Sequence, residues 1–288
     1  MHDFPAPTGG RRPSPAATLL SWLALLVIVA GVVAVVISAQ RSQAEPPLPV
    51  SAPPVSAGLQ GGPVVQPTGA AAAPGDAASR LSTFWGVDIS WPQCDWTPTV
   101  SSGFAIVGVN GGRPFTANPC LSAQVAYAKR QSGYAAYMNL DAPRGPDPTS
   151  YGRRAALDAL SRARAAGLHV HTMWLDVEVL NHWADPATNV AVMNGAAAAL
   201  RARHVTPGVY SSVPMWEQIT GGGRLTMPLW LATSVLDYRD VQPLCRAGLG
   251  GEPAVMAQYV AGTDGHLLDV DVLCRNAGTD VVHLFTAP

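Results

Sequence analysis

Short β-prone runs alternate with Ala-rich helical runs through residues 81–288, and this alternation constrains the fold more than any other feature of the sequence. Such an alternation is typical of parallel strands joined by helices, and eight strands are enough to close a barrel. We therefore expect an α/β fold, a TIM-like (β/α) barrel with irregularities in its last third. The expected strands are 85–90, 104–110, 134–140, 169–177, 208–211, 229–233, 255–260 and 267–272, and the expected helices are 121–131, 150–166, 187–203 and 213–218.

The fourth expected strand, in the segment from His169 to Glu178, ends in two carboxylates. Asp176 and Glu178 are two positions apart, so on a strand they share one face with Trp174 and their Cα atoms lie about 6.6 Å apart. Two carboxyl groups that close in a partly buried site repel, so the pKa of one should rise relative to that of the other. Such a pair suits general acid catalysis. The alternative is that Asp176 caps a turn and Glu178 is solvated.

Other expected strands also carry acids. Asp88 lies between Val87 and Ile89, and if those apolar side chains pack against helices, Asp88 points into the barrel. Asp269 and Asp271 alternate with valines in the same way. Unpaired buried carboxylates cost several kcal/mol, so acids from three strands that face one interior are hard to explain by packing alone. We interpret them as parts of a site.

Several short motifs occur in an order that resembles the family 25 glycoside hydrolases, the muramidase-type lysozymes. The resemblance spans nearly all of residues 81–288, and its most specific parts are the Asp-x-Glu strand and the leading Asp. It implies a β/α barrel that cleaves the β-1,4 bond between N-acetylmuramic acid and N-acetylglucosamine in peptidoglycan. The motifs are Gly86-Val-Asp-Ile-Ser90, Phe104-Ala-Ile-Val107, Trp174-Leu-Asp-Val-Glu178, Gly208-Val-Tyr-Ser-Ser212, Pro228-Leu-Trp-Leu-Ala232, Ala257-Gln-Tyr259 and Asp269-Val-Asp-Val-Leu273.

The resemblance also implies roles for individual residues. By position, Glu178 is the proton donor, Asp176 orients or stabilises the substrate's N-acetyl group, and Asp88 and Asp269 are the other acids of the groove. Glycoside hydrolysis usually needs one carboxyl group of raised pKa and one that is ionised, which agrees with this division. The candidate substrate-binding residues are Tyr210, Trp230, Tyr137, Gln258 and Asp271, and the sequence leaves open whether Asp269 or Asp271 faces the substrate.

The chain departs from the family pattern at two strand ends. Where the family usually has Thr-Glu-Gly after the second strand, this chain has Val109-Asn-Gly-Gly-Arg-Pro114, so a groove acid is missing and we expect Arg113 to occupy its space. The Tyr-His-Phe that commonly ends the third strand is replaced by Tyr137-Met-Asn-Leu-Asp141, whose last residue begins a turn-like segment. The chain resembles a divergent, exported branch of the family.

The first 80 residues are predicted to form three segments. Residues 16–39 contain no charged residue and are long enough to cross a bilayer as a helix. Arg11 and Arg12 precede this stretch, so residues 1–15 are expected to be cytoplasmic and the rest extracytoplasmic, as in a single-pass cell-membrane protein. A cleaved signal peptide, or a twin-arginine signal, would instead give a secreted protein. Residues 40–80 are rich in Pro, Ala and Gly and are predicted to be a disordered linker to the barrel domain, 81–288.

All four cysteines lie after the predicted membrane helix, and none forms a Cys-x-x-Cys pair. In an oxidising compartment disulfides are the first interpretation. Of the three possible connectivities we favour the local one, Cys94 with Cys120 and Cys245 with Cys274. Each would close a loop worth about 3–4 kcal/mol in the chain-entropy model.

Charge and motif content restrict the partners. The formal net charge of -1 offers no general attraction to nucleic acid, so none is expected as a partner. His169 and His171 lie on the strand face opposite Asp176 and Glu178, so these residues cannot share one metal ion. Gly221-Gly-Gly223 lacks the context of a phosphate loop. We therefore expect neither a metal nor another cofactor, and the expected partners are a cell-wall glycan and the membrane.

Two functions remain open from the sequence. The first is a membrane-anchored glycoside hydrolase that acts on peptidoglycan, with Glu178 as general acid and Asp176 assisting. The second is a catalytically weak or inactive barrel that serves as a glycan-binding module of the cell wall. The missing groove glutamate favours the second function, and the presence of Asp88, Asp176, Glu178 and Asp269 favours the first.

Overall fold

The structure is a computed structural model of the 288-residue chain, and it describes residues 85–99, 101–233, 235, 238–263, 266–277 and 280–286. The cytoplasmic tail, membrane helix and linker predicted for residues 1–80 lie outside the described residues, as does the predicted start of the barrel domain at residue 81. Among the helices of the described part, none combines the length and the apolar character needed to cross a bilayer.

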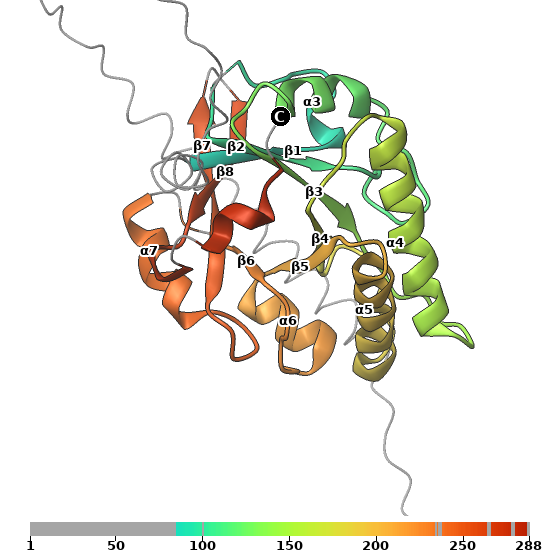
Figure 1. Ribbon diagram of the computed structural model, residues 1–288. Coiled ribbons are helices and arrows are strands. Elements are labelled where there is room, and N and C mark those ends of the chain that lie inside the picture. The colour runs from blue at the N-terminus through green and yellow to red at the C-terminus, as the bar shows by residue number, and fades with distance from the viewer. Residues whose placement is uncertain are drawn as a thin grey trace, which may run out of the picture. The chain divides into compact units, whose positions relative to one another are not determined.

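In the described part of the chain, eight strands close into a barrel in sequence order, as predicted (Figure 1). Consecutive strands from β1 to β7 pair in parallel, whereas β8 is antiparallel to both of its neighbours, β7 and β1. The expected irregularity of the last third is therefore a β7–β8 hairpin. The strands are β1 (Trp85–Ile89), β2 (Phe104–Gly108), β3 (Tyr134–Asn139), β4 (Thr172–Asp176), β5 (Thr206–Ser211), β6 (Leu229–Ala232), β7 (Ala254–Thr263) and β8 (His266–Leu273).

The helices lie around the outside of the barrel, and α4 and α5 lie side by side (Figure 1). Among the described residues between β1 and β2 there is no α-helix, and a short 3-10 helix, η1 (Trp91–Gln93), follows β1 instead. The helix α7 was not predicted, because its sequence contains Pro243 in the middle. Besides η1, the helices are α3 (Leu121–Ala128), α4 (Pro148–Ala165), α5 (Pro186–Arg201), α6 (Val213–Thr220), α7 (Tyr238–Ala247), η2 (Arg275–Ala277) and η3 (Asp280–Leu284).

Local sequence signals explain where the long helices begin and how closely they pack. Asp147 and Asp185 each accept a hydrogen bond from a backbone N–H in the first turn of α4 and α5, and a proline follows each cap. Gly152 of α4 lies so close to α5 that an added Cβ would come within 1.9 Å of the Val192 carbonyl oxygen. The two helices therefore pack so closely at Gly152 that any residue with a side chain at this position would collide with α5.

The core has two layers. Apolar residues on the outer faces of the strands pack against the helices, and a second cluster that includes Phe104, Trp174 and Trp230 fills the barrel interior. The C-terminal segment closes one end of this interior: Phe285 packs on Phe104 with ring centroids 4.4 Å apart, and Thr286 pairs with Tyr134 at the start of β3. The start of β3 is thereby covered, and polar side chains collect at the opposite end, where β1 to β7 finish.

Both disulfides of the favoured local pairing are present. Cys94 is bonded to Cys120, with Cα atoms 5.4 Å apart, and this bond ties the segment after η1 to the start of α3. Cys245 is bonded to Cys274, with Cα atoms 5.7 Å apart, and this bond ties α7 to the end of β8. Each bond fixes a segment that borders the open end of the barrel or its last hairpin.

Candidate active site

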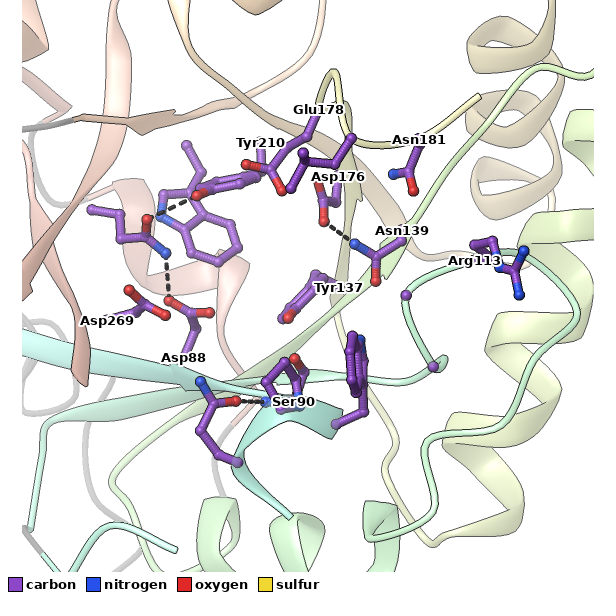
Figure 2. A pocket seen from close by; sticks show the side chains of 18 of the residues that line it. Asp88, Ser90, Arg113, Tyr137, Asn139, Asp176, Glu178, Asn181, Tyr210 and Asp269 are labelled. Atoms are coloured by element: carbon purple, nitrogen blue, oxygen red, sulfur yellow. Dashed lines mark hydrogen bonds between the residues drawn. The ribbon is translucent and has the colours of Figure 1, made fainter. Parts of the chain in front are cut away.

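Four predicted acids converge on one cavity at the end of the barrel where the parallel strands finish (Figure 2). Asp88 comes from β1, Asp176 is the last residue of β4, Glu178 follows two positions later, and Asp269 comes from β8. The cavity has a volume of about 680 Å³. The other residues that line it are Ser90, Trp91, Pro92, Gln93, Gly111, Gly112, Arg113, Tyr137, Asn139, Leu180, Asn181, His182, Tyr210, Trp230 and Gln258.

Asp176 and Glu178 form an electrostatically strained pair. Asp176 is 2% exposed and one of its oxygens, Oδ2, accepts a hydrogen bond from the Asn139 side chain, whereas its Oδ1 has no partner among the described residues. Burial, and then the charge of Glu178, raise the pKa of Asp176 well above its ordinary value. Burial, and then the charge of Asp269, raise the pKa of Glu178. Two such groups retain a proton far more readily than free carboxyls do.

Asp88 lies at the base of the cavity in a chain of hydrogen bonds. The Tyr210 hydroxyl donates to Gln258 Oε1 at 2.8 Å, and Gln258 Nε2 donates to Asp88 Oδ2 at 2.7 Å. Burial raises the pKa of Asp88 well above its ordinary value, the charges of Asp271 and Asp269 raise it further, and the Gln258 contact lowers it. Asp88 also lies directly opposite Asp269 in the β1–β8 register, so both side chains point to the interior.

The direction of β8 decides between Asp269 and Asp271. Because β8 runs antiparallel to its neighbours, Asp269 lies nearer the open end of the barrel and Asp271 lies deeper. Asp269 lines the cavity, whereas Asp271 is fully buried and accepts a hydrogen bond from Trp230 Nε1 at 2.8 Å. The expectation that Asp271 contacts substrate is wrong, because that carboxylate lies beneath the cavity floor.

The predicted aromatic residues form the floor and one wall. Trp230 is 1% exposed and packs against Tyr210 and Tyr137, with ring centroids 4.4 Å and 6.0 Å away. At the rim, Trp91 of η1 is 47% exposed beside Gly112, where a Cβ would come within 2.9 Å of the indole nitrogen. Flat rings with a polar edge, arranged around a polar hollow, suit the faces of sugars.

A second hollow adjoins the cavity on the side of α6 and α7. It has a volume of about 390 Å³ and shares Glu178, Tyr210 and Gln258 with the first. Its remaining lining is mainly apolar and includes Val213 and Leu231. Glu178 therefore stands between a polar hollow and an apolar one.

Two amide residues, Asn110 and Asn139, are parts of this site that the sequence reasoning did not assign. Asn139 lies two positions after Tyr137 on β3 and is paired in register with Asp176 of β4. The sequence does carry a signal for this placement, because residues two positions apart on a strand, such as Tyr137 and Asn139, face the same side. Asn110 is 1% exposed and is the second residue after β2. Arg113, which was expected to take up the space of the missing acid, lines the cavity and is exposed, whereas Asn110 is buried.

The remaining candidates lie at a distance or make structural contacts. His169 and His171 precede β4, at the end of the strand opposite Asp176, and the His171 N–H donates to Thr286 Oγ1. His182 lines the cavity near Asn181. Asp141 accepts a hydrogen bond from the Tyr151 hydroxyl at 2.5 Å. Within the described ranges, no group of three or more His, Cys, Asp or Glu residues is arranged to hold a metal ion.

Comparisons with known proteins agree with the geometry. A family model described as lysozyme-like protein 1 matches residues 97–237. The probable GH family 25 lysozyme 2 of Dictyostelium discoideum is 40% identical over 62 residues, which make up 21% of this chain and 29% of that protein. Lysozyme-like protein 5 of Caenorhabditis elegans is 36% identical over 80 residues, 27% of this chain and 36% of that protein. The matches span about a third of each relative.

The fold itself is shared over a longer stretch. A family GH25 lysozyme from Aspergillus fumigatus superposes with a TM-score of 0.53 at 14% sequence identity, covering 71% of this chain and 99% of that one. Over residues 97–237 the sequence is thus similar to lysozyme-like proteins, and the barrel shares the fold of a family GH25 lysozyme.

Proposed function

We propose that this barrel is a glycoside hydrolase that cleaves the β-1,4 bond between N-acetylmuramic acid and N-acetylglucosamine in peptidoglycan. The observation that carries the proposal is the Asp176–Glu178 pair, whose raised pKa values suit a general acid, at the junction of two hollows. The similarity to lysozymes supports it.

In the proposed reaction, protonated Glu178 gives its proton to the glycosidic oxygen as the bond to the anomeric carbon breaks. The carbonyl oxygen of the substrate's own N-acetyl group attacks that carbon. Asp176 Oδ1, which has no partner among the described residues, accepts a hydrogen bond from the N–H of the same amide and orients it. Water then opens the cyclic intermediate and gives a proton to Glu178, which now acts as base.

The two remaining acids, Asp269 and Asp88, support the reaction without acting on the glycosidic bond. Burial is the largest cause that raises the pKa of Glu178, and the charge of Asp269 raises it further, which helps to keep the acid protonated. Asp88 and Gln258 hold the Tyr210 hydroxyl, whose proton points to Gln258, so that the tyrosine oxygen offers lone pairs to a sugar hydroxyl. A polymer that crosses the site would occupy both hollows, with Glu178 between them.

The acid is tested by Glu178→Gln, which preserves shape and removes the proton donor. We expect turnover of soluble peptidoglycan fragments to fall by at least about 100-fold, since general acid catalysis contributes about that much or more, while glycan binding is retained. Glu217→Gln, an exposed change on α6, is the matched control and should keep wild-type turnover. Hydrolysis by Glu178→Gln at the wild-type rate would contradict the assignment.

A binding module is the second candidate, and the amide of Asn110 at a position where the family has an acid favours it. Wild-type protein that binds peptidoglycan and releases no product would support this candidate and contradict the first.

We also propose that residues 16–39 anchor the barrel at the outer face of the cell membrane, with residues 40–80 as a spacer. The uncharged stretch and the preceding Arg11 and Arg12 support this proposal. An anchored chain should remain in the membrane fraction after a high-salt wash, at the mass of the full sequence. A shorter chain free in the medium would indicate a cleaved signal peptide instead.

A further inference from the structure

The ends of β2, β3 and β4 are joined by two consecutive amide contacts. The Asn110 side chain donates through Nδ2 to the Asn139 carbonyl at 2.9 Å, and its Oδ1 accepts from the Asn139 N–H at 3.1 Å. The Asn110 side chain thereby makes the two hydrogen bonds that a neighbouring strand's backbone would make, and it extends the β2–β3 pairing beyond Gly108, the last residue of β2. Because Asn110 is 1% exposed and makes both bonds, it fixes the backbone of Asn139.

The second contact runs from the Asn139 side chain to Asp176, and Figure 2 shows it as a dashed line between these two residues. The donor is Nδ2 and the acceptor is Asp176 Oδ2. An amide N–H binds an ionised carboxylate roughly twice as strongly as a neutral acceptor. The contact therefore favours the ionised form of Asp176. The Glu178 carboxylate has no comparable amide donor among the described residues. Its side-chain contact is with Asp176, and that contact raises the pKa of Asp176 and lowers the pKa of Glu178, in opposition to the Asn139 contact.

We propose that Asn139, held in place by Asn110, is a positioning residue that keeps Asp176 ionised, so that the proton shared by the two carboxyl groups rests on Glu178. The inference rests on the proposed function, because a proton on Glu178 is what the acid step requires. Asn110 and Asn139 also lie in the two segments where the sequence departs from the family 25 pattern. Together, these two departures from the family pattern form one chain of hydrogen bonds from Asn110 through Asn139 to Asp176.

Other groups that face the pair do not replace this donor. Asp269 raises the pKa of Glu178 and so acts in the same direction as the Asn139 contact, but as an acid it does not stabilise the ionised form of Asp176. Within the described part of the chain, the basic residues of the cavity lining form no ion pair with Asp176 or Glu178. The facing groups are Asp88 on β1, Tyr137 on β3, Tyr210 on β5, Asp269 on β8, and Arg113 and His182 at the rim.

The direct test follows the two carboxyl carbons by NMR while the pH is varied, in the full chain with its disulfides formed. In wild type we expect Asp176 to titrate at a lower pH than Glu178. Asn139→Leu removes the donor at similar volume and should raise the Asp176 titration by about one to two pH units, the shift that corresponds to a hydrogen bond to a charged group. Unchanged titrations of both carbons would overturn the inference.

Asn139→Asp serves as the second variant, because it preserves shape even if Asn139→Leu does not fold. Its new carboxyl group can donate only while it is protonated, so its loss of activity relative to wild type should grow as the pH rises. The kcat of Asn139→Leu should fall about 10-fold to 100-fold, with the acidic limb of its pH profile displaced upward and KM little changed. A loss that is equal at every pH would indicate a purely structural role and overturn the inference.

Asn194 provides the controls, because it is exposed on α5, away from the cavity lining. Asn194→Leu and Asn194→Asp should leave the titrations and the pH profile unchanged. These experiments distinguish a failure of the inference about Asn139 from a failure of the proposed hydrolase function. A wild-type chain that hydrolyses nothing would contradict the proposed function, and the NMR titration would still decide where the proton lies.

Discussion

Individual carboxyl groups at the open end of the barrel are held in conditions that favour their protonated forms. For Asp88, Asp176, Glu178, Asp269 and Asp271, burial is the largest cause that raises the pKa. Only some of them have a donor that offsets this cost, as Gln258 does for Asp88 and Trp230 does for Asp271. Burying these carboxyl groups is unfavourable for their charged forms, and the same burial keeps at least one of them protonated and able to transfer a proton.

Gln258→Leu tests how much one such hydrogen-bond donor contributes to the free energy of unfolding. The change leaves Asp88 buried without a partner, so the free energy of unfolding should fall by about 1–3 kcal/mol at pH 7. The fall should be smaller at pH 4, where Asp88 takes up a proton more easily. Denaturant unfolding at both pH values measures it. In an Asp88→Asn background the same change should cost less, and an equal cost in both backgrounds would show that the two side chains are not coupled.

The acids of the site could be predicted from the sequence, whereas their partners could not. Strand parity is sufficient to place Asp88, Asp176 and Glu178 toward one interior. The contact between Asn139 and Asp176 depends on the register of β3 against β4, which parity does not determine. The burial of Asp271 likewise depends on the direction of β8, which the alternating pattern leaves open.

At the element scale, the barrel is closed at one end by a segment that is not a strand. Sequence periodicity located the eight strands to within a few residues, because buried β-prone runs separated by helices have a strong pattern. It did not indicate that η3 and Phe285 fill the interior, since a short irregular segment has no periodicity. The reversal of β8 follows from the short β7–β8 connection, which leaves too few residues for a crossover helix.

Phe285→Ala tests this closure. Phe285 is 5% exposed and packs on Phe104, so its truncation should lower the free energy of unfolding by about 3–5 kcal/mol through lost burial and a residual cavity. Calorimetry or denaturant unfolding measures the loss.

Phe115→Ala is the matched control, because that ring is 44% exposed, and it should cost much less. Equal losses for the two variants would mean that the C-terminal segment does not contribute to the core in the way described.

At the scale of the whole molecule, the buried acids should make stability depend on pH in an unusual direction. The pKa values of the five site carboxyls are raised in the folded protein, which therefore holds protons that the unfolded chain has already released. The free energy of unfolding should accordingly fall as the pH rises above the ordinary carboxyl pKa of about 4 and through the raised pKa values.

Thermal unfolding of the full chain between pH 5 and pH 8 checks this dependence, with a higher Tm expected at pH 5. Asp271→Asn removes one buried charge while keeping an oxygen that can accept from Trp230, so it should flatten the dependence and raise the Tm at pH 8. A Tm that rises from pH 5 to pH 8 in wild type would show that these carboxyls ionise freely in the folded protein.

The central claim, that the barrel hydrolyses the muramyl bond with Glu178 as acid, is tested most directly by the products formed from purified peptidoglycan. The full chain and its Glu178→Gln variant would be incubated with peptidoglycan, and the new reducing ends would be reduced with borohydride and identified by mass. Our account predicts reduced N-acetylmuramic acid ends from the wild type alone. Reduced N-acetylglucosamine ends, or equal products from both proteins, would contradict it.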